Sequence, residues 1–425
     1  MIPKLYDHQE KIIKENRLKC GLFLGTGASK TRTALEMAEG NTLVICPKQQ
    51  REDKTWEREN DKWGTEVDLK VISKEDLRKM WEELPYYKTV IIDEVHNNLG
   101  VMPAYVQRNK VQIPKTSQIF EATKNFIDKH PPKRLYLLSA TPVPKPMSMW
   151  GIGILFGKKW DFSEFRSAYY IEIRMGGVRR IWMPKKDEAT KQRLANLVQR
   201  FGYTGGLNDF FDVPEQTHKN VEIDLSADQK KAVEDITLSE ADPLVRRARL
   251  RTIENGVLYG KKIEKVDSKT DLMTKNTIIF KSHKIDYILE RAQEFPKMLI
   301  FANYTAQIEE IAKALRKEKY KVSILNGATK DRSFIKTVDD SPEPHIIIAQ
   351  CSISSGYELP SFPCVIYASK SWRYVDYEQS LGRVLRSNKL KKNLYIHLVV
   401  EGCDKDCHDS IMSGQDFQEK LTLNI

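Results

Sequence analysis

A short segment near the N-terminus carries the residue types that bind phosphate groups. Residues 21–31 read Gly-Leu-Phe-Leu-Gly-Thr-Gly-Ala-Ser-Lys-Thr, an apolar run followed by a glycine-rich turn and Lys30-Thr31. Glycines let backbone N–H groups curl around phosphate oxygens, and the N-terminus of a following helix adds the positive end of its dipole. The pattern predicts a phosphate loop in which Lys30 reaches the β- and γ-phosphates and the Thr31 hydroxyl holds Mg²⁺.

The loop departs from the usual pattern at one position. Ser29 stands directly before the lysine, where glycine is usual, so the backbone there must accept a Cβ. We expect Gly25, Gly27 and Ser29 to take part in binding the phosphates. A glycine-rich turn that precedes a helix and binds nothing is the alternative interpretation of this segment.

A second segment supplies carboxylates. Residues 90–96 read Val-Ile-Ile-Asp-Glu-Val-His, an apolar strand that ends in two acids. Parallel α/β sheets bind ligands at the carboxyl ends of their strands. Asp93 can hold Mg²⁺ through water there, and Glu94 can polarise the attacking water. The alternative is a strand that ends in solvated acids, but such a pair after a phosphate loop favours nucleotide hydrolysis.

Short apolar runs alternate with helical patterns over two stretches of the chain. We expect strands at 42–46, 69–73, 89–93 and 135–139, and again at 298–302, 321–325, 346–349, 364–368 and 394–400. Continuous apolar strands between helices are typical of a parallel sheet covered on both faces. The predicted fold class is therefore α/β, with two parallel-sheet domains at 1–150 and 265–425. An inserted, partly helical linking subdomain is expected at 151–264.

Composition restricts the class of protein. The chain has 425 residues, too many for one ordinary core, and its 40% hydrophobic content is normal for a globular protein. No apolar run approaches the ~18 residues that span a bilayer, so no membrane partner is expected. Lys and Arg outnumber Asp and Glu by 69 to 58, which suits a polyanionic partner.

The cysteines do not predict a second metal site. Six are scattered along the chain, as in a reduced intracellular protein. Cys403, Cys407 and His408 offer three zinc ligands where a closed structural site normally needs four. The polar tail after residue 402 is expected to form a loosely packed helix.

Asp93-Glu94-Val95-His96 resembles the DExH box of superfamily 2 helicases, and other motifs of that family follow in order. Residues 6–9 (Tyr-Asp-His-Gln) resemble the glutamine motif, 42–48 motif Ia, 139–142 (Ser-Ala-Thr-Pro) motif III and 299–304 motif IV. Residues 354–359 resemble motif V, and 379–386 fit motif VI, Gln-x-x-Gly-Arg-x-x-Arg. Each short match is weak alone, but their joint order supports the resemblance.

The resemblance implies two RecA-like domains that hydrolyse ATP with Mg²⁺, and it implies roles for single residues. Arg383 and Arg386 would be presented from the second domain to the transferring phosphoryl group. The other implied residues bind nucleotide (Gln9, at the adenine edge, Gly356 and Gln379) or couple ATP state to nucleic acid (His96, Ser139 and Thr141). Lys48, Ser73, Asn303 and Asn326 are candidates for contacts to DNA phosphates, with ordinary solvated loop residues as the alternative.

The linking region resembles the Swi/Snf-type branch at residues 162–166, 213–217 and 250–256. Compact motors of this kind include bacteriophage branch-migration helicases. The resemblance implies a monomeric DNA helicase or translocase in the cytoplasm of a bacterial or phage-infected cell, acting on single-stranded, forked or branched DNA. Two alternatives stay open: an RNA helicase, and a nucleic-acid-binding regulatory protein with a weakened ATP site, which only Ser29 favours.

Residues 170–182 predict a β-hairpin with Gly176-Gly177 as a two-residue turn. In that register Met175 faces Val178 and Arg174 faces Arg179. Ile171, Ile173, Met175, Val178 and Trp182 then share one face with Arg180, and Arg174 and Arg179 lie on the other. Such a hairpin could wedge apart duplex strands while its arginines hold phosphates. The alternative is that its apolar face simply packs on the first domain.

Overall fold

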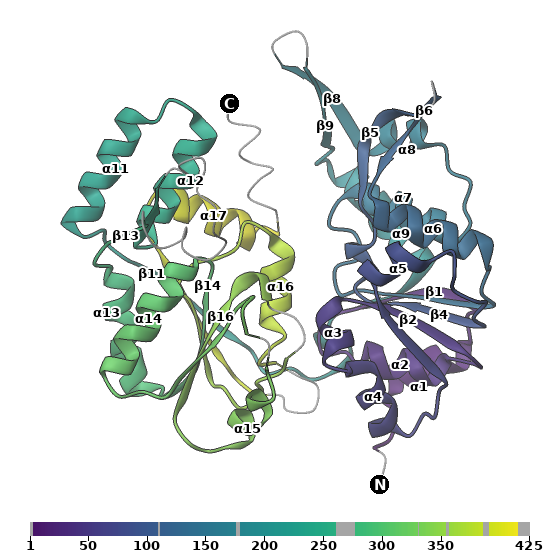
Figure 1. The fold of residues 1–425 in the computed structure, drawn as a ribbon, viewed down its shortest axis with the longest axis horizontal. Helices are drawn as coiled ribbons and strands as arrows, with labels where there is room; N and C mark the ends of the chain where they lie inside the picture. The colour runs from purple at the N-terminus through teal and green to yellow at the C-terminus, as the bar shows by residue number, and fades with distance from the viewer. Residues whose placement is uncertain are drawn as a thin grey trace. The chain divides into compact units, whose positions relative to one another are not determined.

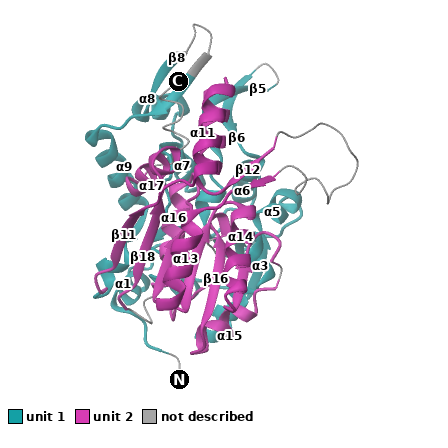
Figure 2. Ribbon diagram, turned by 90° about the vertical axis from the view of Figure 1, so that its left-hand side faces the viewer, with its two compact units in different colours: residues 1–212 teal, residues 213–425 magenta. Residues whose placement is uncertain are grey.

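The computed structural model describes residues 3–108, 111–175, 179–260, 277–329, 331–353, 357–385 and 391–414, without the side chains of residues 174, 175, 179 and 180. The chain forms two compact units, Met1–Asp212 and Val213–Ile425 (Figures 1 and 2). The predicted linking subdomain at 151–264 is thus shared between them. Each unit is described by itself.

A parallel six-stranded sheet forms the centre of the first unit. Its strand order is β10-β1-β7-β4-β2-β3, with every described pairing parallel. The strands are β1 (Lys19–Leu24), β2 (Thr42–Cys46), β3 (Leu69–Ser73), β4 (Thr89–Ile92), β7 (Arg134–Leu138) and β10 (Gly202–Gly205). Strands β2, β4 and β7 are buried at every position, which is why they appear in the sequence as continuous apolar runs.

Helices cover both faces of this sheet (Figure 1). Val44 of β2 packs with the first cluster of helices, α1, α2 and α4, whereas Leu43 and Ile45 pack with the second, α5 to α9, as strand alternation requires. The helices are α1 (Asp7–Glu15), α2 (Lys30–Met37), α3 (Lys48–Glu52), α4 (Thr55–Trp63), α5 (Lys74–Met80), α6 (Gln118–Lys129), α7 (Pro146–Leu155), α8 (Phe162–Tyr169), α9 (Glu188–Phe201), α10 (Leu207–Phe210) and the 3₁₀ turn η1 (Val95–Asn97).

Two antiparallel hairpins extend from the first unit. One, β5 (Val101–Arg108) with β6 (Val111–Thr116), follows the Asp-Glu-Val-His segment and was not predicted. The other, β8 (Tyr170–Met175) with β9 (Arg179–Pro184), is the predicted hairpin, but its predicted register is wrong. Arg174 pairs with Arg180 and Met175 with Arg179, so three residues rather than two connect the strands.

The register change moves Trp182 to the other face of the hairpin. Trp182 pairs with Glu172, whereas Ile173 pairs with Ile181. Since side chains of successive strand residues alternate between faces, Trp182 does not share the face of Ile171 and Ile173, contrary to the prediction. The sequence pattern misled because a three-residue connection shifts the register of β9 against β8 by one residue compared with a two-residue turn. A shift of one residue moves the β9 side chains to the opposite face of the hairpin.

The second unit is built on another six-stranded parallel sheet, of order β11-β18-β17-β14-β16-β15. Its strands are β11 (Thr217–Glu222), β14 (Lys297–Ala302), β15 (Val322–Leu325), β16 (His345–Gln350), β17 (Cys364–Tyr367) and β18 (Leu394–Val399). Two short strands, β12 (Val257–Tyr259) and β13 (Thr277–Ile279), pair separately. The helices are α11 (Ala227–Ser239), α12 (Pro243–Glu254), α13 (His283–Glu294), α14 (Thr305–Lys317), α15 (Phe334–Asp340), α16 (Tyr374–Leu381), α17 (Cys403–Met412) and the 3₁₀ turn η2 (Cys351–Ile353).

The C-terminal helix is not the loosely packed helix that its polarity predicted. Residues Cys403, Asp404, Cys407, His408, Ser410 and Ile411 of α17 are buried. The Lys284 ammonium donates to the Asp404 carboxylate at 2.8 Å and to the Asn255 amide oxygen at 2.7 Å. Burial raises the pKa of Asp404, but Lys284 and Arg251 outweigh it and hold that pKa at about 2. Charge pairing therefore lets a polar helix join the core.

The predicted fold class is confirmed: two α/β units, each on a parallel sheet. The predicted strands agree with the observed ones to within one residue at each end. No helix in the part of the chain that the structure describes is long and apolar enough to cross a membrane.

Candidate functional site

Three neighbouring strands carry the sequence motifs of the first unit to one edge of its sheet. Strands β1, β7 and β4 lie side by side, with β7 in the middle. The phosphate loop follows β1, Ser139 and Thr141 follow β7, and Asp93 and Glu94 follow β4. Because the strands are parallel, all three segments leave the sheet at its carboxyl edge, where such folds bind ligands.

The phosphate loop connects β1 to α2 through two residues with positive φ. Gly27 has φ of 83°, and Ser29 has φ of 57° and ψ of 35°. Ser29 therefore adopts the left-handed conformation that glycine favours, which costs an L-residue roughly 1–2 kcal/mol. The serine keeps the loop conformation of a glycine at the price of local strain.

The Lys30 side chain points back along the loop. Its ammonium donates to the carbonyl oxygens of Leu24 at 2.8 Å and Gly25 at 3.0 Å. The positive charge therefore lies beside the two carbonyls at the start of the loop.

Gln9 is fully buried against the same loop. Its amide donates to the Thr33 hydroxyl at 3.1 Å and to the Ser29 carbonyl at 3.4 Å, and its oxygen accepts from the Tyr6 N–H at 3.0 Å. The residue predicted to reach the adenine edge is thus tied directly to the residues that surround the phosphate site.

Asp93 is a buried carboxyl that lies directly beside the Glu94 carboxylate. Burial, and secondly the Glu94 charge, raises the pKa of Asp93 to about 7, and Lys30 opposes the shift. Glu94 is left-handed, with φ of 48°, and its N–H donates to Asp93 Oδ1 at 2.8 Å. A buried carboxyl beside a second carboxyl fits Mg²⁺, a hard cation with oxygen ligands, because the cation would relieve their repulsion.

A series of close polar contacts joins Glu94 to the Ser-Ala-Thr segment. His96 Nδ1 lies 3.3 Å from Glu94 Oε2 and 2.9 Å from the Ser139 hydroxyl oxygen. That oxygen also accepts from the Thr141 backbone N–H at 3.0 Å. The three residues predicted to couple nucleotide state to nucleic acid, His96, Ser139 and Thr141, are therefore in direct contact.

In the second unit, Arg383 is buried and already hydrogen-bonded. Its guanidinium donates to the carbonyls of Tyr357 at 2.8 Å and Gln379 at 2.9 Å. It thereby fixes helix α16 to the segment after residue 356. Gly356 and Arg386 lie outside the described residues.

The four candidate DNA contacts occupy different environments. Lys48 is exposed at the start of α3, with its ammonium 3.5 Å from Glu52. Ser73 is buried and caps α5 through Asp76, so its hydroxyl serves the helix. Asn326 Oδ1 accepts from the Ala328 N–H at 3.0 Å, within a turn after β15. Asn303 follows β14 and accepts through its carbonyl from Gln350. The side chains of Arg174, Arg179 and Arg180 lie outside the description.

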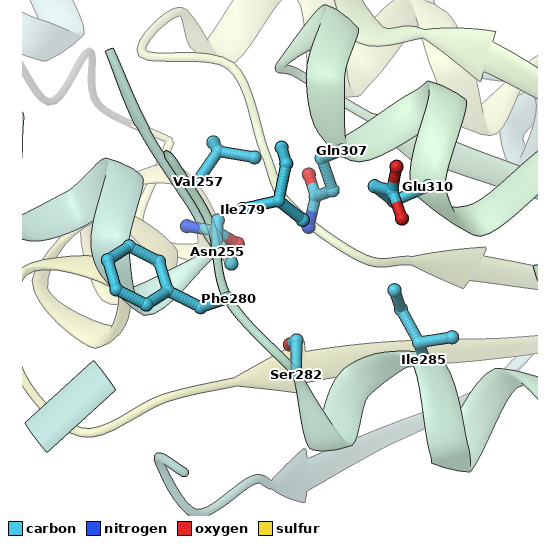
Figure 3. A pocket seen from close by; sticks show the side chains of 9 residues that line it. Asn255, Val257, Ile279, Phe280, Ser282, Ile285, Gln307 and Glu310 are labelled. Carbon is cyan, nitrogen blue, oxygen red and sulfur yellow. The ribbon is translucent and has the colours of Figure 1, made fainter. Parts of the chain in front are cut away.

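A small pocket in the second unit lies apart from these motifs (Figure 3). Asn255, Gly256, Val257, Ile279, Phe280, Ser282, Ile285, Gln307 and Glu310 line it. Asn255 binds Arg251, Lys284 and Asp404, and Gln307 accepts from Ser369, so two of its polar side chains serve internal packing. No group of three or more His, Cys, Asp or Glu side chains in the described ranges assembles a metal site.

Two residues near the phosphate site escaped the sequence analysis. Gln50 donates to the Asp93 carboxylate, which lowers the pKa of that group. His8 lies 3.3 Å through Nε2 from the Ala28 carbonyl and stacks on Phe210, with ring centroids 4.2 Å apart. The sequence around Gln50 carries no motif that predicts this contact. His8 lies next to Gln9 in the segment that resembles the glutamine motif, but no role was predicted for it.

Comparison with known proteins found a match between part of the chain and one protein family, and a similarity to a solved structure. Residues 281–388, which contain motifs IV to VI, match the helicase conserved C-terminal domain. The matched residues all lie in the second unit. The chain is also similar to the SWI2/SNF2 ATPase core of Sulfolobus solfataricus solved in complex with dsDNA, at 19% identity over 99% of this chain and 95% of that one, with a TM-score of 0.40. A comparison with curated proteins found no match.

Proposed function

We propose that this protein is an ATP-driven DNA translocase or helicase of superfamily 2, acting on single-stranded, forked or branched DNA. The observation that carries the proposal is the convergence of Lys30, Asp93 and Glu94 at the carboxyl edge of the sheet, after β1 and β4, the two strands that flank β7. The helicase C-terminal domain at residues 281–388 supports it. A basic balance of 69 Lys and Arg against 58 Asp and Glu suits a nucleic acid partner.

In the proposed reaction the first unit binds ATP through its phosphate loop. Backbone N–H groups around Gly25 and Gly27 hold phosphate oxygens, and Lys30 leaves the Leu24 and Gly25 carbonyls to contact the β- and γ-phosphates. Thr31 and Asp93 would hold Mg²⁺, which neutralises phosphate charge when bound. Glu94 accepts a proton from, or orients, the water that attacks the γ-phosphorus.

The remaining motif residues have separate parts in this proposal. Gln9 reads the adenine edge, and Gly356 and Gln379 contribute to nucleotide binding from the second unit. Arg383 and Arg386 stabilise charge on the transferring phosphoryl group. His96 senses Glu94 and passes a change in its position to Ser139 and the Thr141 backbone. Lys48, Ser73, Asn303 and Asn326 are proposed DNA-phosphate contacts. Ser73 would have to leave the Asp76 carboxylate, to which its N–H and its hydroxyl both donate.

Steady-state ATPase assays on the purified chain test this function. ATP turnover is compared without nucleic acid and with single-stranded, duplex, forked and four-way DNA, and with RNA of the same sequence. DNA stimulation is expected, and the order of the DNA substrates identifies the preferred structure. Stimulation by RNA but not DNA would assign an RNA helicase instead, and no stimulation by either would refute the motor.

DNA binding is expected to be independent of sequence and sensitive to salt. Contacts to phosphates release counterions, so log K should fall linearly with log salt, with a slope of about −0.9 per contacted phosphate of duplex. Fluorescence anisotropy of two unrelated duplexes between low and moderate salt measures this slope. An affinity unaffected by salt, or a strong preference for one sequence, would contradict backbone recognition.

The β8–β9 hairpin is expected to act on duplex DNA. Replacing Arg174, Arg179 and Arg180 with Ala should stop fork unwinding or branch migration, while single-strand-stimulated ATPase largely survives. The reason is that strand separation needs the hairpin, whereas phosphate chemistry does not. Gel-based unwinding and ATPase assays on the same preparation compare the two activities. Normal unwinding by the folded triple variant would leave the hairpin a packing role only.

A further inference from the structure

One arginine joins the two hairpins of the first unit. The guanidinium carbon of Arg166, on α8, lies 4.0 Å from the ring centroid of Trp182 and 4.9 Å from that of Tyr105. Trp182 belongs to β9 and Tyr105 to β5. Tyr105 also packs edge-on against Phe162, with centroids 5.0 Å apart. Planar guanidinium groups stack well on aromatic faces. Arg166 therefore links both hairpins to helix α8.

The pairing of the first hairpin separates a packed face from an outer face. Tyr105 pairs with Pro114, whereas Arg108 pairs with Val111, three positions from Tyr105 along β5. Strand alternation therefore puts Arg108 and Val111 on the face opposite Tyr105. Lys115 shares the outer face, because it lies an even number of residues from Val111 on β6.

The outer face is basic and accessible. The sequence from Val101 to Thr116 contains no acidic residue. Lys115 is exposed, and Arg108 is 54% exposed although Nη1 lies 3.2 Å from Glu121. Val111 is 60% exposed. A positive surface with an exposed apolar side chain beside Arg108 suits a nucleic acid, because phosphates pair with the cations and sugars or bases contact the apolar side chain.

We propose that the β5–β6 hairpin is a second DNA-binding element, and that Arg166 holds it and the β8–β9 hairpin together as one DNA-binding surface. Arg108 and Lys115 contact phosphates, and Val111, which pairs with Arg108, contacts the sugar or base edge beside the Arg108 phosphate. Arg166 is a positioning residue, since its cation is enclosed by Tyr105 and Trp182. This inference rests on the proposed function, and it adds a surface that follows the Asp-Glu-Val-His segment directly in the chain.

Removing the charge of the first hairpin tests the surface. The double variant Arg108→Gln/Lys115→Gln should bind forked DNA several-fold more weakly. Its salt slope should be shallower by about 0.9 for each phosphate that the hairpin no longer neutralises. The matched control is Lys70→Gln/Lys79→Gln, which removes the same charge from two exposed lysines on β3 and α5 of the same unit. The control should bind like the wild type.

The outcomes separate the surface from the proposed function. If the wild type binds DNA and the hairpin variant retains its affinity and salt slope, the surface is wrong while the motor stands. The surface also fails if control and hairpin variants are weakened by the same factor, because the effect is then one of general charge. If the wild type neither binds DNA nor shows DNA-stimulated ATPase, both proposals fail.

A double-mutant cycle tests the role of Arg166. Arg166→Gln removes the cation from between the rings, whereas Arg166→Lys keeps it and should rescue part of the DNA affinity. In the Arg166→Gln background, Arg108→Gln/Lys115→Gln should reduce affinity by a smaller factor than in the wild type, because the hairpin is no longer held in place. Thermal melts identify variants that fail to fold. Equal factors in both backgrounds, with Arg166→Lys folded, would overturn the positioning role.

Discussion

Glu94→Gln should lose ~10²–10⁴-fold of the ATP turnover, the usual contribution of a positioned acid–base group. Its amide keeps the size of the carboxylate but cannot accept a proton from water. ATP binding should persist or tighten, because Glu94 already repels the neighbouring Asp93 and the substitution removes that repulsion. Phosphate release and the affinity for a fluorescent ATP analogue are measured on the same protein.

Lys30→Ala provides the complementary variant. It should lose turnover through weaker binding, because the charge at the phosphate loop is removed. A folded Glu94→Gln protein with normal kcat would refute the assignment of Glu94, and a Lys30→Ala protein with normal kcat would refute the phosphate loop itself. The two variants therefore separate the chemical step from the binding step.

Arg386→Ala should lower ATP turnover by ~10³–10⁵-fold, the usual effect of removing an arginine finger. DNA affinity should change far less. Arg383→Ala should impair turnover as well, but it should also destabilise the second unit. Its guanidinium holds the carbonyls of Tyr357 and Gln379, and a buried polar group left unpaired costs about 1–3 kcal/mol.

Thermal unfolding, ATPase and DNA anisotropy distinguish the two arginines. A melting temperature lowered in Arg383→Ala but not in Arg386→Ala is the expected pattern. Arg383→Lys is the matched control, since it keeps a donor without the fork of the guanidinium. Weakened DNA binding with intact ATPase in either Ala variant would make that arginine a DNA ligand instead.

The two sheets were predictable because buried parallel strands carry their own signal. Strands such as β2 and β4 are apolar at almost every position, and the chemistry-bearing residues follow them directly. Two edge strands, β10 and β11, were not predicted, whereas the edge strands β3 and β15 were. β11 is exposed at five of its six positions, and it reads Thr-His-Lys-Asn-Val-Glu, so its place beside β18 depends on tertiary pairing alone.

The residues of the candidate site likewise divide into those that the sequence predicted and those that it did not. Lys30, Asp93 and Glu94 were found from residue type and spacing, whereas the contact of Gln50 with Asp93 joins segments that are distant in sequence. The β5–β6 hairpin was missed because Pro103 and Pro114 interrupt its strands. In the β8–β9 hairpin the Gly-Gly pair pointed to a tight turn, and the observed three-residue connection shifted every pair that follows.

The segment that connects the two sheets runs from β10, an edge strand of the first sheet, to β11, an edge strand of the second. β10 pairs with β1 from Gly202 to Gly205, and β11 pairs with β18 from Thr217 to Glu222. Residues 206–216, which include α10 (Leu207–Phe210), therefore join the edge strand of one sheet to the edge strand of the other. The partner of β10 is β1, which continues into the phosphate loop, so the connection leaves the first sheet beside the strand that leads to the candidate nucleotide site.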